Sequence, residues 1–259
     1  MDIATVAGLA VAIGAILLSA ILEGSPLGTL FKPSAMILIF GGTIGATMTS
    51  FGLKDILGLP KLMLKTIMPP KRAPEDIVKE MVNLAELARR EGLLSLDQRV
   101  GTIQDPFARK GIRLVVDGAN PELIQSMLEA EIALKAQTAK HEASLFEAAG
   151  GFAPTMGIIG TVMGLVHVLG NLAEPDKLGE AIAAAFVATL WGIMTANVIW
   201  LPMGNKLKLL AKEESLIAQL TAEGILSIQR GDNPRIVEEK LLIFVQSEGK
   251  PGKAAEEAA

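Results

Sequence analysis

Two threonine hydroxyls lie inside long apolar runs of this chain, where a hydroxyl can coordinate an ion or a water molecule. Thr161 lies in the run 152–172 and Thr189 lies in the run 181–201. A threonine in the middle of a membrane helix is more often satisfied by the carbonyl four residues earlier in its own helix. The residues alone leave both interpretations open, ion coordination and local packing.

Two prolines flank the same pair of runs. Pro154 lies near the start of one run and Pro202 lies just past the end of the other. Because antiparallel spans place these two positions at the same membrane face, and because proline removes a backbone hydrogen bond, we interpret both as candidate hinges. The alternative is that each proline only terminates a helix.

The apolar runs contain no Lys, Arg, Asp or Glu. A proton path through hydrocarbon normally uses an ionisable side chain, most often a carboxylate whose pKa is raised by burial. If this chain conducts ions, the acid must therefore come from another subunit. The chain has no cysteine and only two histidines, His141 and His167, which argues against a metal site.

The composition and the apolar runs together predict an all-α integral membrane protein with four transmembrane helices in two hairpins. Half of the 259 residues are hydrophobic, only 20% are charged and the mean hydropathy is +0.43. About 20 apolar residues cross a bilayer, and four runs reach that length, at 3–22, 33–51, 152–172 and 181–201. A cleaved signal peptide at the first run is the alternative, but Asp2 stands where a basic region is expected.

The charged middle of the chain predicts a water-facing helical domain between the hairpins. Ile77, Met81, Leu84 and Ala88 recur at helical spacing and are expected to share one buried face. The predicted layout is transmembrane helices 1 and 2 at 1–53, a helical cytoplasmic domain at 54–149, transmembrane helices 3 and 4 at 150–205, cytoplasmic C-terminal helices at 206–248 and a disordered tail at 249–259.

Charge distribution predicts the orientation in the membrane. Of the 24 Lys and Arg residues, only Lys32 and Lys177 lie in the short connections between paired spans. Positive charge concentrates in cytoplasmic loops, so both termini and the domain 54–149 are expected in the cytoplasm.

Charges of both signs gather around one predicted helix end, at Arg89, Arg90 and Asp97. Gly92 is expected to end that helix, and the segment 95–98 (Ser-Leu-Asp-Gln) predicts a capping box that opens the next one. Such a cluster is usually a solvated helix terminus. The alternative is an electrostatic docking surface for a partner protein.

The combined pattern resembles the MotA/PomA family of flagellar motor stator subunits. The resemblance rests on the paired hairpins, on the segments 87–97 (LARREGLLSLD) and 154–161 (PTMGIIGT), and on the fourth span closing at Pro202. It implies that Arg89, Arg90 and Asp97 contact the rotor protein FliG. It further implies that Thr161 and Thr189 lie near the ion path and that Pro154 and Pro202 couple ion flow to movement.

The resemblance also implies a non-enzymatic protein of the bacterial inner (cytoplasmic) membrane. Five such chains would surround a dimer of a MotB/PomB-type subunit that supplies the ion-binding aspartate. No cofactor is implied beyond the coupling ion, H+ or Na+. Hydroxyls at Thr161 and Thr189 are typical of sodium-driven members, whereas Ala188 before Thr189 is found in many proton-driven ones, so the ion stays open.

Two other functions fit part of the pattern. A TolQ/ExbB-like subunit that energises envelope processes shares the assembly around a partner dimer, but such proteins usually have three spans with a large loop after the first. A membrane scaffold that does not conduct ions would need only the four anchors and the cytoplasmic helices.

Overall fold

A computed structural model describes residues 2–69, 72–170 and 175–248, and these residues contain helices and no strand. The predicted all-α fold class is confirmed. The predicted disordered tail at 249–259 lies outside the described residues, as does most of the connection between the third and fourth spans.

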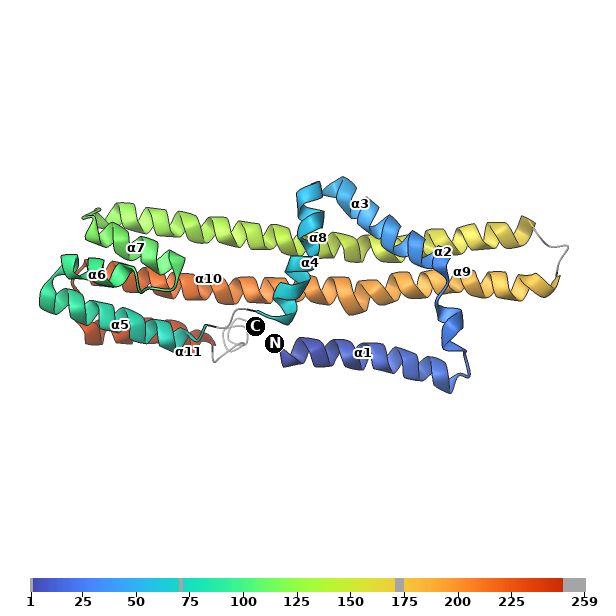
Figure 1. Ribbon diagram of the computed structural model, residues 1–259, viewed down its shortest axis with the longest axis horizontal. Coiled ribbons are helices and arrows are strands. Elements are labelled where there is room, and N and C mark those ends of the chain that lie inside the picture. The colour runs from blue at the N-terminus through green and yellow to red at the C-terminus, as the bar shows by residue number, and fades with distance from the viewer. Residues whose placement is uncertain (1, 70–71, 171–174, 249–259) are drawn as a thin grey trace, which may run out of the picture. The chain divides into compact units, whose positions relative to one another are not determined.

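The helices follow one another with short connections (Figure 1). The first part of the chain contains α1 (Ile3–Leu22), η1 (Leu27–Leu30), α2 (Pro33–Met36), the π-helical η2 (Ile37–Gly41), α3 (Gly42–Ser50) and α4 (Leu53–Ile67). The middle contains α5 (Pro74–Glu91), η3 (Leu93–Leu96), α6 (Asp97–Val100) and α7 (Pro106–Val116). The rest contains α8 (Pro121–Gly170), α9 (Pro175–Thr195), the π-helical η4 (Ala196–Trp200), α10 (Leu201–Gln229) and α11 (Pro234–Glu248).

The chain forms two compact units. The first unit contains Met1–Pro70 and Ala139–Leu210, and the second contains Lys71–Thr138 and Ala211–Ala259. The two units are defined by contacts between helices, so their limits do not mark the membrane surface. The membrane boundaries expected after residues 53, 149 and 205 therefore stay predictions.

Among the described residues, four helical stretches are long and apolar enough to cross a membrane, as predicted. They are Ile3–Leu22, Leu27–Ser50, part of Pro121–Gly170 and part of Ala181–Gln229. The first of them buries none of its residues within this chain, so α1 presents nearly all of its apolar surface to lipid or to another chain.

Neither proline ends a helix, so the interpretation of Pro154 and Pro202 as helix terminators is wrong. Pro154 lies within the 50-residue helix α8. Pro202 lies within the continuous helical path from α9 through η4 into α10, so the helix passes the position at which the fourth span is expected to close. A proline ring clashes with the carbonyl four residues earlier, here that of Val198, and the wider π-helical turn of η4 falls on that residue.

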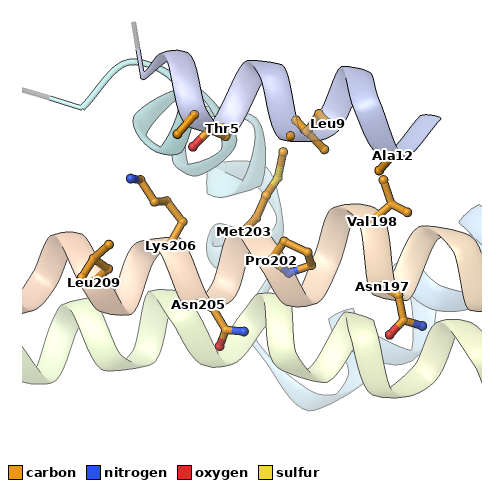
Figure 2. A pocket seen from close by; sticks show the side chains of 12 residues that line it. Thr5, Leu9, Ala12, Asn197, Val198, Pro202, Met203, Asn205, Lys206 and Leu209 are labelled. Carbon is orange, nitrogen blue, oxygen red and sulfur yellow. The ribbon is translucent and has the colours of Figure 1, made fainter. Parts of the chain in front are cut away.

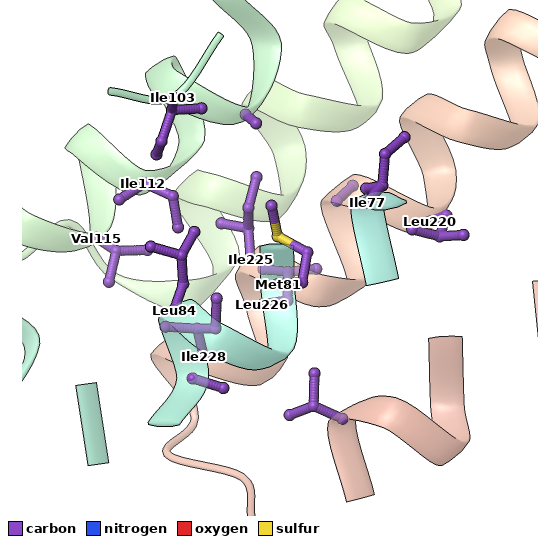
Figure 3. Close-up of a cluster of buried hydrophobic side chains, with 14 of the residues drawn as sticks. Ile77, Met81, Leu84, Ile103, Ile112, Val115, Leu220, Ile225, Leu226 and Ile228 are labelled. Carbon is purple, nitrogen blue, oxygen red and sulfur yellow. The ribbon is translucent and has the colours of Figure 1, made fainter. Parts of the chain in front are cut away.

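The second unit has its own hydrophobic core (Figure 3). Ile77, Met81 and Leu84 of α5 are buried as predicted, and Ala88 is partly buried against the same cluster. Across from them Ile225 of α10 is fully buried. Further buried members come from α7, α8 and α11, among them Ile112, Val115, Leu128, Val237 and Leu241. This core holds the short helices that carry the charged turn described below.

Candidate functional site

The third and fourth spans pack backbone against backbone. A Cβ atom added at Gly192 of α9 would lie 2.5 Å from the carbonyl oxygen of Ala153 in α8. A Cβ atom added at Gly157 would lie 3.0 Å from the Cα atom of Thr189. Small residues allow transmembrane helices this close approach, which brings main-chain carbonyls of one helix within reach of side chains of the other.

This close approach brings Thr161 and Thr189 together, although 27 residues separate them. Their hydroxyls are in hydrogen-bond contact with each other. The Thr161 hydroxyl also lies 3.2 Å from the carbonyl oxygen of Gly157 in its own helix and 3.2 Å from that of Ala185 in α9. The Thr189 hydroxyl lies 3.2 Å from the same Gly157 carbonyl. Four oxygens therefore form one half-buried cluster.

The oxygen cluster is compatible with both sequence interpretations. Each hydroxyl has one proton to donate and accepts as well, so the two threonines satisfy each other and the neighbouring carbonyls without an ion. Hydroxyl and carbonyl oxygens are also the ligands that hard cations prefer. The cluster contains no carboxylate, so a charged partner for a cation or a proton must come from outside the hairpin.

Trp191 fixes α9 against the start of the second span. Its Nε1 donates to the carbonyl of Leu30 at 2.7 Å, and its ring centroid lies 5.5 Å from that of Phe31. Since Trp191 lies two residues after Thr189, this contact restrains the rotation of α9 about its axis. The threonine is thereby held toward α8.

The two prolines flank one buried cluster at the other end of the hairpin. Ala153, next to Pro154, and Met203, next to Pro202, are both buried in it together with Trp200. The Trp200 ring lies 6.1 Å, centroid to centroid, from that of Phe146 in α8. A change of helix direction at either proline would therefore disturb the same packed group.

Pro202 also lines a groove of about 540 Å³ between α1 and the η4–α10 junction (Figure 2). The α1 wall is made of small and short side chains, including Thr5, Gly8 and Ala12. Asn197 of η4 lines the groove as well, and its Nδ2 donates to the carbonyl of Ile193 at 2.9 Å. Pro202 thus has packed side chains on one side and open space on the other.

Asp2 makes contacts with Thr5, Ile67 and Lys206 that we did not predict from the sequence. Its carboxylate accepts hydrogen bonds from Lys206 Nζ at 2.5 Å and from the Thr5 hydroxyl at 2.8 Å, while its backbone N–H donates to the carbonyl of Ile67. These contacts, led by the hydrogen bond from Lys206, lower the pKa of Asp2 to about 2. Asp2 before an apolar run was visible as a helix N-cap, but nothing in the sequence indicated Lys206 as its partner.

The turn that carries Arg89, Arg90 and Asp97 lies in the second unit. Gly92 ends α5 as predicted, with a φ of +84° that favours glycine. The predicted capping box is wrong, because residues 93–96 already form the 3₁₀ turn η3. The Ser95 hydroxyl lies within that turn and donates to the carbonyl of Gly92 at 2.7 Å.

Arg89, Arg90 and Asp97 are all exposed, and the backbone that carries them is anchored by the fully buried Leu96. Within the described residues, no hydrogen bond or ion pair engages these three side chains. Both signs of charge are thus held in place on a fixed turn and are available to a partner.

Other charged side chains of the second unit form ion pairs with one another within that unit. Burial favours a raised pKa for Glu131, but hydrogen bonds from Lys110 at 2.7 Å and Lys135 at 3.0 Å hold the pKa below its usual value. The pKa of Asp232 is lowered chiefly by the hydrogen bond from Lys240. No cluster of three or more His, Asp or Glu side chains suited to a metal ion occurs in the described parts of the chain.

Comparisons with known proteins match nearly the whole chain. Residues 6–92 match the motility protein A N-terminal family, and residues 99–219 match the MotA/TolQ/ExbB proton channel family. Motility protein A of Bacillus subtilis is 35% identical, with all of both chains covered. Motility protein A of Borreliella burgdorferi is 39% identical, with 95% of this chain and 94% of the relative covered. Chemotaxis protein PomA of Vibrio alginolyticus is 34% identical, with 96% and 97% covered.

Two solved structures have the same fold. The structure of C. jejuni MotAB matches with a TM-score of 0.89 and 29% identity, covering 94% of this chain and 96% of that one. The flagellar MotAB stator complex of Bacillus subtilis matches with a TM-score of 0.85 and 35% identity, covering 96% of both chains. The chain therefore belongs to the MotA/TolQ/ExbB proton channel family, as one of its MotA/PomA flagellar motor stator proteins.

Proposed function

We propose that this chain is the ion-conducting stator subunit of a bacterial flagellar motor and that it generates torque on the rotor together with a MotB/PomB-type partner. The observation that carries the proposal is the cluster of Thr161, Thr189 and two carbonyl oxygens in a membrane hairpin whose apolar runs contain no acid. An ion could use these oxygens only beside a carboxylate from another chain.

The partner would supply that carboxylate. The solved relatives are named as MotAB complexes, which contain two kinds of subunit. Assembly with other chains is supported by the apolar surface that α1 leaves uncovered. We propose five copies of this chain around a partner dimer, with neutralisation and recharging of the partner's aspartate driving rotation of the ring.

The proposed location is the bacterial inner membrane, with both termini in the cytoplasm. Support comes from the scarcity of Lys and Arg in the two short connections between paired spans. No bond-making step is required by this function, so we propose that the chain has no enzymatic activity and needs no cofactor beyond the coupling ion.

We propose that Arg89, Arg90 and Asp97 contact the rotor protein FliG. Their side chains are exposed and unpaired among the described residues, and they are mounted on a turn anchored by Leu96. Charge pairs of this kind favour orientation and rapid, reversible contact more than tight binding, which suits a surface that pushes and releases.

The coupling ion is proposed to be H+ or Na+, and one residue beside the threonine cluster bears on the choice between them. Ala188, which precedes Thr189, is buried, and its Cβ lies 2.6 Å from where a Cβ of Gly160 would be. A larger side chain at position 188 would therefore meet the α8 backbone at Gly160, next to Thr161. Swimming speed measured in cells complemented with this chain and its partner, with sodium and pH varied independently, would identify the ion.

The Thr189 hydroxyl provides the sharpest test of the proposed ion path. Thr189→Val keeps the shape of the side chain and removes the hydroxyl, so we expect reduced ion flux through the complex with the partner. Thr189→Ser keeps the hydroxyl and is the matched control, with flux expected near that of the unaltered chain. If both variants assemble and conduct equally, the hydroxyl serves packing alone.

A TolQ/ExbB-like role remains a second candidate because residues 99–219 match a family that includes those proteins. The match of residues 6–92 to the motility protein A N-terminal family favours the stator. Restoration of swimming in a strain that lacks its own stator subunit would separate the two.

A further inference from the structure

Helix α4 follows directly on the second candidate span. That span ends with α3 at Ser50, and α4 begins at Leu53, with only two residues between them. Figure 1 shows α4 lying across the neighbouring part of α8 and not along it. A helix that leaves a span and turns across the spans runs close to the membrane plane, at the level where the headgroups lie.

One face of α4 is fixed against the membrane unit. Leu59 and Leu62 are buried in the same cluster as Ala143 and Phe146 of α8. The first turn is held by Asp55, whose carboxylate accepts from the backbone N–H of Gly52 at 3.0 Å and lies 3.4 Å from His141 Nε2. The direction of the opposite face is therefore set by the fold.

That opposite face is divided into an apolar and a basic sector. At about 100° per residue, Leu53, Leu57, Leu64 and Met68 fall within one narrow arc. These four are 61%, 72%, 55% and 51% exposed, which is unusual for apolar side chains on a helix outside the spans. Large apolar side chains remain this exposed on an amphipathic helix that rests in a membrane interface.

The basic sector lies directly beside the apolar arc. By the same helical spacing it contains Lys54, Lys61 and Lys65. These three lysines line a groove of about 630 Å³ that also contains Asp55 and Glu142. Asp55 is already engaged by the Gly52 N–H and His141, so Lys54 and Lys61 outnumber Glu142, the other acidic side chain of the groove.

We propose that this face of α4 binds anionic phospholipids of the membrane in which the chain is embedded. The four apolar side chains enter the boundary between headgroups and acyl chains, and Lys54 and Lys61 bind the headgroup phosphates. A second copy of the chain fits less well, since it would have to bring both an apolar strip and acidic groups to the same face. The proposal requires only that the chain spans a membrane, and it goes beyond the proposed ion conduction.

The position of the apolar sector can be measured with one spin label, because the chain contains no cysteine. The full chain carrying Leu57→Cys is purified with its partner, labelled and reconstituted in vesicles of phosphatidylcholine with one quarter phosphatidylglycerol. Collisions with oxygen are expected to exceed those with a water-soluble nickel chelate. A label at Leu94→Cys, where the native side chain is 76% exposed in the second unit, is the water-facing control. A Leu57 label that meets the chelate freely, or that is shielded from both reagents by a neighbouring copy, overturns the proposal.

The lysines are tested by lipid titration of the same purified complex, followed by native mass spectrometry. Lys54→Gln with Lys61→Gln should weaken phosphatidylglycerol binding about thirtyfold and leave phosphatidylcholine binding unchanged. Lys79→Gln with Lys212→Gln removes the same charge from exposed lysines of the second unit and should change neither. Equal phosphatidylglycerol binding by both double variants refutes the assignment. Neither measurement depends on ion flux, so a failed lipid proposal and a failed stator proposal give different results.

Discussion

Gly192→Ala should separate the third and fourth spans. The added Cβ would lie 2.5 Å from the Ala153 carbonyl oxygen and 3.1 Å from the Gly157 Cα atom. Both are main-chain atoms of the facing helix, so no side chain can rotate away. Ordinary contact begins at 3.4 Å, which requires the helices to move apart by 3.4 − 2.5, or about 0.9 Å, along that direction.

The expected change in the free energy of unfolding combines two unfavourable contributions with one favourable contribution. Overpacking of this kind costs about 1–3 kcal/mol, and exchanging Gly for Ala in a helix returns up to about 1 kcal/mol. The same movement stretches the 3.2 Å contact between the Thr189 hydroxyl and the Gly157 carbonyl, which adds about 0.6 kcal/mol. With the full return from Gly to Ala, the net destabilisation is about 0.6–2.6 kcal/mol, or roughly 1–10 °C in the unfolding temperature of a chain of this size.

The assay compares thermal unfolding of the purified complex with swimming speed of complemented cells. Gly151→Ala is the matched control, because a Cβ at Gly151 meets nothing within 4 Å and the residue lies on the facing helix. We expect Gly192→Ala to unfold earlier and to swim more slowly, and Gly151→Ala to do neither. Equal unfolding temperatures for the two variants would refute the reasoning from close backbone contact.

Three further predictions concern the remaining sites. Arg89→Glu with Asp97→Lys should abolish swimming and leave assembly intact. The free energy of unfolding should change by no more than about 0.5 kcal/mol, since both side chains are exposed and unpaired among the described residues. Normal swimming would remove the rotor-contact assignment. The contribution of Asp2 to stability is expected to be complete above pH 3.8, its ordinary pKa, and lost as the pH falls toward about 2. Asp2→Asn should therefore lower the unfolding temperature by the same amount at pH 5 and pH 8, and a deficit seen only at one of these would contradict the assigned pKa. Pro202→Leu should slow rotation without loss of membrane insertion, whereas unchanged rotation would argue against a hinge there.

Properties of single helices were readable from the sequence. Four apolar runs of sufficient length predicted the four spans. An Asn-Pro pair such as that at 120–121 is typical of a helix start, and at the start of α8 Asn120 accepts from the Leu123 N–H at 2.8 Å. Gly92 predicted the end of α5. Each of these features depends on neighbours within a few residues along the chain.

Features that depend on how one helix is rotated relative to another could not be predicted from the sequence. Thr161 and Thr189 face each other only when each helix is rotated correctly about its own axis. The close backbone contacts at Gly157 and Gly192 set that rotation. The pairing of Asp2 with Lys206 joins two residues far apart in the sequence that no local pattern connects. The sequence signal for η4 was Pro202 just past the end of an apolar run, but a proline permits a kink, a stop or a π-helical turn, and packing decides among them.

The Gly157–Gly192 contact and the neighbouring turn η4 differ in how much room they leave for movement. Around Gly157 and Gly192 the helices touch through main-chain atoms, so a bend there would require backbone overlap or loss of the threonine contacts. At η4 the helix already has an irregular turn, lacks the backbone N–H of Pro202, and borders a groove of about 540 Å³. Bending into that groove disturbs fewer packed atoms. If ion binding near Thr189 displaces the fourth span, the displacement must therefore appear at η4 and pass through Lys206 and Asp2 to α1.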